Sequence, residues 1–187
     1  MNRITAYIRQ SLQDIYPPEE VKALSMLICC DMLGVDALDI YMGKDIILSE
    51  CKQRELENII FRLQKNEPIQ YIRGYAEFCG RNFRVAPGVL IPRPETAELV
   101  DLIVKENPDA RRLLDIGTGS GCIAISLDKN LPDAKVDAWD ISEEALAIAR
   151  KNNEELDAQV TFRRQDVFSA DGIQGASYDI IVSNPPY

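Results

Sequence analysis

The sequence predicts an α/β protein with a parallel sheet, preceded by a helical bundle and a β-hairpin linker. Two observations predict this fold class. Apolar residues recur at helical spacing through residues 1–67, and from residue 111 onward β-branched runs alternate with helical ones. Strands that alternate with helices are typical of a parallel sheet with right-handed crossovers.

Residues 1–67 predict a small helical bundle. Pro17-Pro18 interrupts a first helix, and a second helix follows and ends at Gly34. A third helix is expected from its Ser49 cap to just before the next proline, with a short helical turn near Asp36–Tyr41. Because this part lacks a constellation of catalytic side chains, we expect it to be a packing or docking domain.

Residues 68–94 predict the hairpin linker. The runs Ile69–Tyr75 and Glu77–Val85 are rich in aromatic and β-branched residues, and the segment Gly80–Asn82 is the expected turn. Prolines then break regular structure ahead of a helix that opens at Glu95 or Thr96.

Residues 95–187 predict the parallel sheet and its helices. Strands are expected at residues 112–116, 136–140, 159–163 and 178–183, with helices at residues 122–129 and 143–155. Ser142 precedes the second of these helices as its cap, and acidic residues occupy the first turn, where the helix dipole favours them.

The composition excludes several function classes. The chain has no histidine, which removes Ser-His-Asp and Cys-His nucleophiles and histidine metal sites. Its five cysteines are odd in number and lack C-x-x-C spacing, so we expect reduced thiols and no metal site. A net charge of −9 argues against a nucleic-acid substrate. No apolar run is long enough for a membrane span and no signal segment opens the chain, so we expect no membrane partner and a cytoplasmic location.

A glycine-rich turn, Asp115-Ile-Gly-Thr-Gly-Ser-Gly121, follows the first expected strand. Its glycines permit positive φ and let a ligand approach the backbone. The spacing is G-x-G-x-G and not the dinucleotide fingerprint G-x-G-x-x-G, which favours an amino-acid tail over a pyrophosphate. A tight strand–helix turn without a ligand is the alternative. The residues expected to bind a cofactor here are Gly117, Thr118, Gly119, Ser120 and Gly121.

Two acidic residues follow later strands. Asp140 closes the second strand, where a carboxylate accepts hydrogen bonds from the ribose hydroxyls of a nucleoside. Helix capping is the alternative for this residue. Asp166, after the third strand, is expected to accept from an adenine amino group, with Val167 and Phe168 as apolar neighbours. A turn-forming aspartate is the alternative there.

The run Asn184-Pro-Pro-Tyr187 follows the last strand and predicts a grip on a planar nitrogen. Such a nitrogen is a poor nucleophile because its lone pair is delocalised, so its N–H groups need acceptors while the lone pair turns toward a methyl group. The carbonyls of the Asn184 side chain and the Pro185 main chain are suitable acceptors. Pro186 stiffens the turn and Tyr187 offers a flat face. Catalysis would come from positioning and electrostatics without a general base. A Pro-Pro turn after a strand is the alternative.

Together the glycine turn and the Asn-Pro-Pro-Tyr run predict methyl transfer from S-adenosyl-L-methionine, with Asn184 beside both cofactor and acceptor. The two runs resemble class I S-adenosylmethionine-dependent methyltransferases that act on planar amino groups. Three linker runs are similar to the peptide chain release factor N5-glutamine methyltransferase family: Glu67-Pro-Ile-Gln-Tyr-Ile-Arg-Gly74, Glu77-Phe-Cys-Gly80 and Pro87-Gly-Val-Leu-Ile-Pro-Arg-Pro-Glu-Thr96.

That family combines a helical N-terminal domain, a hairpin linker and a Rossmann-like catalytic domain. The resemblance implies methylation of the side-chain amide nitrogen of the glutamine in the Gly-Gly-Gln motif of release factors, a step of translation termination. By the resemblance, Gly117–Gly121 and Asp140 bind the cofactor, Asn184–Tyr187 hold the glutamine amide, and residues 1–67 contact the release factor. Val167 stands where some members carry an aromatic residue, so stacking on adenine is not implied there.

Family members continue past the tyrosine, so the resemblance implies that residues 95–187 are only the N-terminal part of the catalytic domain. We therefore expect weakened cofactor binding and poor turnover in this chain. Two other functions stay open. The Asn-Pro-Pro-Tyr chemistry fits adenine or guanine in nucleic acid equally well. A helical domain with an incomplete sheet also fits a binding module without activity.

Overall fold

The computed structural model describes residues 3–169 and 177–185. The chain forms two compact units, Met1–Arg73 and Gly74–Tyr187. Within the described residues, no helix combines the length and apolar character that crossing a membrane requires.

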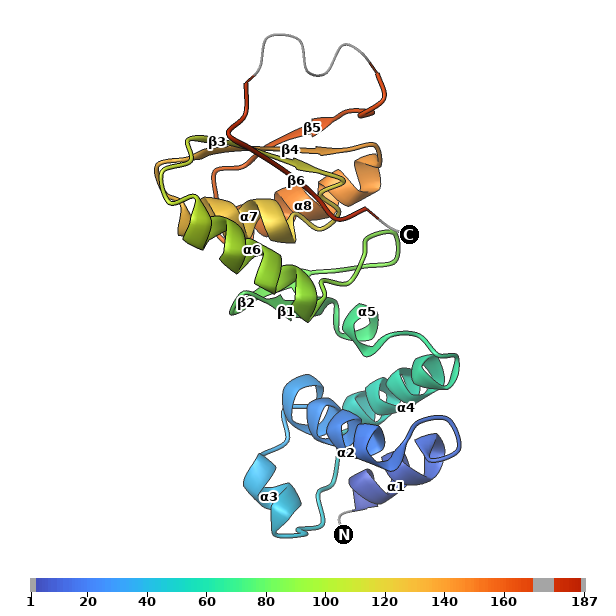
Figure 1. The fold of residues 1–187 in the computed structure, drawn as a ribbon. Coiled ribbons are helices and arrows are strands. Elements are labelled where there is room, and N and C mark those ends of the chain that lie inside the picture. The colour runs from blue at the N-terminus through green and yellow to red at the C-terminus, as the bar shows by residue number, and fades with distance from the viewer. Residues whose placement is uncertain (1–2, 170–176, 186–187) are drawn as a thin grey trace. The chain divides into compact units, whose positions relative to one another are not determined.

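The first unit is a helical bundle (Figure 1). Its helices are α1 (Arg3–Leu12), α2 (Pro18–Met26), the π-helix η1 (Leu27–Met32), α3 (Ala37–Tyr41), α4 (Glu50–Gln64) and α5 (Ile69–Arg73). Their apolar faces meet in one core, where Ile8, Ile28 and Leu56 are almost completely buried. The Ser49 side chain accepts from Lys52 N–H, which confirms the predicted cap of α4.

The second helix of this unit differs from the expected one in its last turns. It is α-helical to Met26 and continues as η1, whose backbone hydrogen bonds span five residues. Gly34, with φ of 63°, follows at the expected end of the helix. The short helix α3 also lies where it is expected, and the Asp36 side chain accepts from Leu38 N–H at its start.

The segment Ile69–Arg73 is helical, so the prediction that it belongs to the hairpin is wrong. Ile69 and Ile72 are three residues apart and both pack against the core of the first unit. Residues at this spacing share one face of a helix. Burial of that face outweighs the β preference of its side chains, because β propensity depends strongly on context.

The second unit opens with an antiparallel hairpin of β1 (Tyr75–Phe78) and β2 (Arg81–Arg84). Its turn is at Cys79-Gly80, one residue before the expected Gly80–Asn82, because Phe78 pairs with Arg81. Cys79 and Gly80 have φ of 46° and 69°, the positive values that a two-residue type I′ turn needs. Phe78 and Phe83 are buried and meet edge to face, with ring centroids 6.0 Å apart.

A four-stranded parallel sheet follows, which confirms the predicted fold class. Its strands are β3 (Arg112–Ile116), β4 (Lys135–Asp140), β5 (Thr161–Arg164) and β6 (Ile180–Ser183), in the order β5-β4-β3-β6. The helices of this unit are α6 (Pro94–Glu106), α7 (Cys122–Asn130) and α8 (Glu143–Glu155), and Figure 1 shows them on one face of the sheet. The Ser142 side chain accepts from Ala145 N–H, so the predicted cap of α8 is confirmed.

Candidate active site

The register of the sheet brings the two sequence motifs together. Ile116, the last residue of β3, pairs with Ser183 of β6 on one side and with Trp139 of β4 on the other. The residues that follow these three are Gly117, Asn184 and Asp140. All three therefore lie at the carboxyl end of the sheet, which is where open parallel sheets bind ligands.

The three glycines of the turn have positive φ, but they serve two different purposes. Gly117 and Gly119 have φ of 74° and 56°, and a Cβ atom at either position would meet no atom within 4 Å. A Cβ on Gly121, where φ is 80°, would lie 3.1 Å from Ile125 Cδ1 and 3.2 Å from Ala149 Cβ. Gly117 and Gly119 therefore leave open space beside the backbone, whereas Gly121 lets the turn pack against α7 and α8.

The backbone N–H groups of the turn are almost all engaged. Gly117 and Thr118 both donate to the Trp139 carbonyl, at 2.8 and 3.0 Å, and Gly121 donates to the Thr118 carbonyl at 2.8 Å. Gly119 N–H donates to Asp140 Oδ2 at 2.8 Å. Among the residues that the structure describes, no acceptor binds Ser120 N–H. This donor is therefore without an acceptor in the described part of the chain, at a residue that is 2% exposed.

Asp140 supports the glycine turn from the end of β4. Its Oδ2 accepts from Gly119, and its Oδ1 accepts from Ser142 N–H at 2.9 Å. This second bond stabilises the entry into α8, in line with the helix-start alternative for Asp140. Each carboxylate oxygen can accept a further hydrogen bond, so these contacts are compatible with ribose binding as well.

A buried carboxylate lies beneath the turn. Asp115 is 1% exposed, and its Oδ2 accepts from the Thr118 hydroxyl at 2.6 Å. Burial raises the pKa of Asp115 from 3.8 to about 6, and hydrogen bonds to the carboxylate, above all from Thr118, oppose that rise. The sequence showed Asp115 only as the residue before the glycines, although an acid inside an apolar strand is itself a signal of a special environment.

The Asn184 carboxamide is held by a residue from the start of α6. Its Nδ2 donates to Thr96 Oγ1 at 3.0 Å, and Thr96 is only 8% exposed. This bond fixes the amide so that its Oδ1 is left as an acceptor, without a partner among the described side chains and backbone. Pro185 is exposed beside it. The predicted positions Pro186 and Tyr187 lie outside the described residues.

One pocket joins the glycine turn to Asn184. It is lined by Leu90, Pro92, Arg93, Thr96, Gly117, Thr118, Gly119, Ser120, Cys122, Ile123 and Asn184. Four of the five predicted glycine-turn residues and the predicted acceptor-binding asparagine thus face the same space. Gly121, Asp140, Asp166, Val167 and Pro185 are not among its lining residues.

The segment Leu90–Thr96 supplies a wall of the pocket that the sequence assigned only to the linker and the start of a helix. The prolines of this segment predict a break in regular structure, but they do not indicate that the segment borders the pocket. Asp166 is not among the lining residues of this pocket and forms a turn, in which its Oδ1 accepts from Phe168 N–H at 3.0 Å. Val167 is 39% exposed beside it.

Two family models match the chain in consecutive segments. The model described as the PrmC N-terminal domain matches residues 4–74. The model described as the methyltransferase small domain matches residues 95–187. The first match covers the helical unit and the second covers the sheet with its helices.

Curated relatives are similar over nearly the whole chain. The release factor glutamine methyltransferase of Bacteroides thetaiotaomicron is 99% identical over 187 residues, which are 100% of this chain and 67% of that protein. The enzyme of the same name from Flavobacterium psychrophilum is 40% identical over 95% of this chain and 64% of its own length. The chain therefore spans about two thirds of the length of these relatives.

Among solved structures, the T. thermophilus 16S rRNA N2 G1207 methyltransferase in complex with AdoMet and guanosine is similar with a TM-score of 0.52. It is 25% identical, and the similarity covers 60% of this chain and 32% of that one. The fold is that of class I methyltransferases, which use S-adenosylmethionine. The two family models match in the expected order along the chain, and the curated relatives are similar over nearly all of it. This chain therefore belongs to the release factor glutamine methyltransferase family.

Proposed function

We propose that the pocket between the glycine turn and Asn184 is where this enzyme transfers a methyl group to the glutamine of the Gly-Gly-Gln motif in release factors. The observation that carries the proposal is that a single pocket is lined by both Gly117–Ser120 and Asn184. A group on one wall therefore lies within reach of a group on the other, as a direct transfer requires.

The glycine turn on one side of the pocket suits the amino-acid tail of a nucleoside cofactor. S-adenosylmethionine supplies an electrophilic methyl group on a sulfonium sulfur. The open sides of Gly117 and Gly119 admit a ligand close to the backbone, and the unengaged Ser120 N–H is a donor suited to a carboxylate. We propose that Asp140, the last residue of β4, accepts from the ribose hydroxyls. For Asp166 and Val167 we propose adenine contacts, supported only by their place after β5.

The acceptor side of the pocket supplies hydrogen-bond acceptors. The Asn184 Oδ1 and the Pro185 carbonyl would accept from the two N–H groups of the glutamine amide and so orient its lone pair toward the methyl group. Thr96 would prevent the Asn184 amide from rotating. As the methyl carbon bonds to the amide nitrogen, its bond to sulfur would break and the neutral thioether would leave. The alkylated amide nitrogen would then be acidic enough to lose its proton to solvent without a general base. Pro186 and Tyr187 would complete the grip.

The helical unit is proposed to dock the release factor. Its α3 and the residues after it expose apolar side chains of a kind found at protein interfaces. Leu38, Tyr41, Met42 and Ile47 are 66%, 76%, 62% and 93% exposed. A translation factor as substrate also supports a cytoplasmic location.

A labelling experiment tests this function. The chain and, as a positive control, its 99% identical full-length relative are incubated with a release factor and methyl-labelled S-adenosylmethionine. We expect one labelled glutamine, and no label in a release factor whose Gly-Gly-Gln glutamine is changed to alanine. Label that persists in this altered factor would contradict the assignment. Label in naked RNA or DNA but not in release factor would favour the nucleic-acid alternative.

A further inference from the structure

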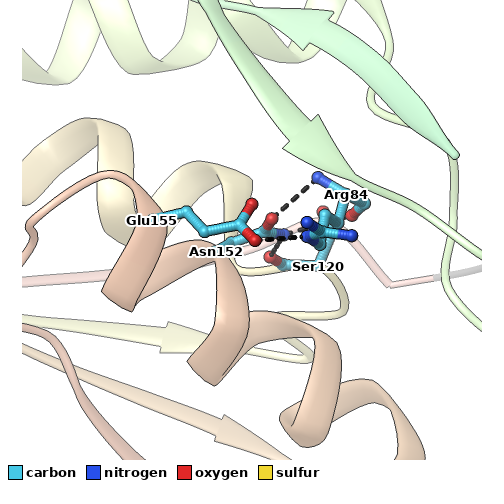
Figure 2. Close-up of polar contacts among 4 residues, drawn as sticks. All are labelled: Arg84, Ser120, Asn152 and Glu155. Atoms are coloured by element: carbon cyan, nitrogen blue, oxygen red, sulfur yellow. Dashed lines mark hydrogen bonds and ion pairs between the residues drawn. The ribbon is translucent and has the colours of Figure 1, made fainter.

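Asn152, in α8, is a buried polar side chain whose hydrogen bonds go to the backbone of two distant segments. It is 1% exposed. Its Oδ1 accepts from Arg84 N–H at 2.7 Å, and its Nδ2 donates to the Arg84 carbonyl at 3.1 Å and to the Ser120 carbonyl at 2.8 Å (Figure 2). Both amide N–H groups are therefore used, as burial demands of a carboxamide.

At the glycine turn, Asn152 immobilises one peptide plane. The Ser120 carbonyl and the Gly121 N–H belong to the same peptide, and this N–H donates to the Thr118 carbonyl. The peptide is thus held at both ends although the glycines on either side of Ser120 leave its backbone unusually free to rotate. Ser120 also carries the unengaged N–H of the turn, so Asn152 fixes the residue that offers this donor.

At the hairpin, Asn152 binds both backbone groups of Arg84, the last residue of β2, as a neighbouring strand would. The chain that leaves β2 continues to Leu90, Pro92 and Arg93, which line the same pocket as the turn. The Asn152 carboxamide therefore connects the glycine turn to β2, the strand that precedes the Leu90–Thr96 wall of the pocket.

A second contact joins α8 to β2 but does not reach the glycine turn. Arg84 Nε lies 2.6 Å from Glu155 Oε1 (Figure 2), and these side chains are 43% and 44% exposed. Exposed ion pairs contribute little to stability. The Arg84–Glu155 pair is therefore a matched control for Asn152, because it bridges the same two elements on the solvent side.

We propose that Asn152 is a positioning residue for methyl transfer. Its carboxamide holds Ser120 at a fixed spacing from the hairpin and so keeps the cofactor-binding backbone in its binding conformation before any ligand arrives. The proposal rests on the proposed binding of S-adenosylmethionine at Gly117–Gly121.

The test compares Asn152→Asp with Glu155→Gln in the cofactor-free chain. Aspartate has the shape of asparagine and keeps the acceptor for Arg84 N–H. Its second oxygen, however, replaces the Nδ2 that donates to the Arg84 and Ser120 carbonyls. We expect amide hydrogen exchange at Gly121 to become about tenfold faster or more in Asn152→Asp. Exchange in β3 and β4 should stay unchanged, and Glu155→Gln should match the unaltered chain.

Unchanged exchange at Gly121 in Asn152→Asp would overturn the proposal, as would equal acceleration throughout β3 and β4, which would indicate a purely structural role. If circular dichroism shows that this variant does not fold, Asn152→Ser is measured in its place, since serine carries no charge and is too short to span both partners.

Calorimetry with S-adenosylhomocysteine gives a second measurement. Affinity should fall about tenfold in Asn152→Asp and stay within about twofold in Glu155→Gln. An unaltered chain that binds no S-adenosylhomocysteine would count against the proposed cofactor site, while the exchange at Gly121 still decides the role of Asn152.

Discussion

At the scale of single residues, burial of Asp115 makes the free energy of unfolding depend on pH. Its pKa is raised from 3.8 to about 6, chiefly by burial beneath the glycine turn. Between these two pH values the folded chain binds more protons at Asp115 than the unfolded chain does. Stability from this group is therefore fully present below the unfolded pKa and is lost as pH rises through the folded pKa.

We accordingly expect Asp115→Asn to gain stability relative to the unaltered chain as pH rises. The difference in unfolding free energy between the two should change by about 2 kcal/mol between about pH 4 and about pH 7.5. Urea unfolding at several pH values measures it, and Asp133→Asn at an exposed surface position is the control. A difference that does not vary with pH would mean that the Asp115 carboxyl titrates as in water.

Thr96 is a second residue whose importance lies in one contact. Its hydroxyl accepts from Asn184 Nδ2, so Thr96→Val should free the carboxamide to rotate. Introduced into the 99% identical full-length relative, this change should lower kcat about 3- to 10-fold and leave cofactor affinity intact. Thr96→Ser keeps the hydroxyl and should retain most of the turnover. Equal turnover in both variants would argue against orientation by Thr96.

At the scale of elements, the glycine turn separates ligand access from helix packing. Gly121→Ala places a methyl group 3.1 Å from Ile125 and 3.2 Å from Ala149, so we expect a loss of about 2 kcal/mol or more in unfolding free energy. Gly119→Ala meets open space and should lose only about 1 kcal/mol, from its positive φ, yet it should weaken cofactor binding more strongly.

Thermal unfolding and calorimetry with S-adenosylhomocysteine distinguish the two alanine variants. If the Gly119→Ala variant bound S-adenosylhomocysteine as tightly as the unaltered chain does, the open space beside Gly119 would not be part of the cofactor site.

Elements whose signals are local could be predicted from the sequence. The caps Ser49 and Ser142 and the parallel strands are set by residues near them in the chain. The local sequence does not predict α5, because the packing of Ile69 and Ile72 against other helices decides its conformation. In the site, the glycine spacing predicts the turn, whereas neither the contact of Thr96 with Asn184 nor the role of Asn152 has a local signal in the sequence. Thr96 is 88 residues from Asn184, and Asn152 is 68 residues from Arg84 and 32 from Ser120. Only the fold brings these partners together.

At the scale of the whole molecule, the described chain consists of a helical unit and a sheet unit, each with its own core. Every sequence-predicted site residue belongs to the second unit, and the exposed apolar side chains of α3 belong to the first. The proposed release-factor surface therefore belongs to one unit, and the proposed methyl-transfer pocket belongs to the other. Changes such as Tyr41→Ser are therefore expected to weaken release-factor binding without altering the affinity for S-adenosylhomocysteine.

The position of β6 has a consequence for solubility. It is the last strand in the order β5-β4-β3-β6, and Ile181 within it is 55% exposed. Among the described residues no strand pairs with the outer edge of β6, and an unpaired apolar strand edge can pair with a strand of another copy, so we expect self-association to increase with the concentration of this chain. Ile181→Lys should raise the concentration at which light scattering begins, whereas Leu102→Lys, which adds the same charge on α6, should do less. Equal effects would show that charge alone governs solubility.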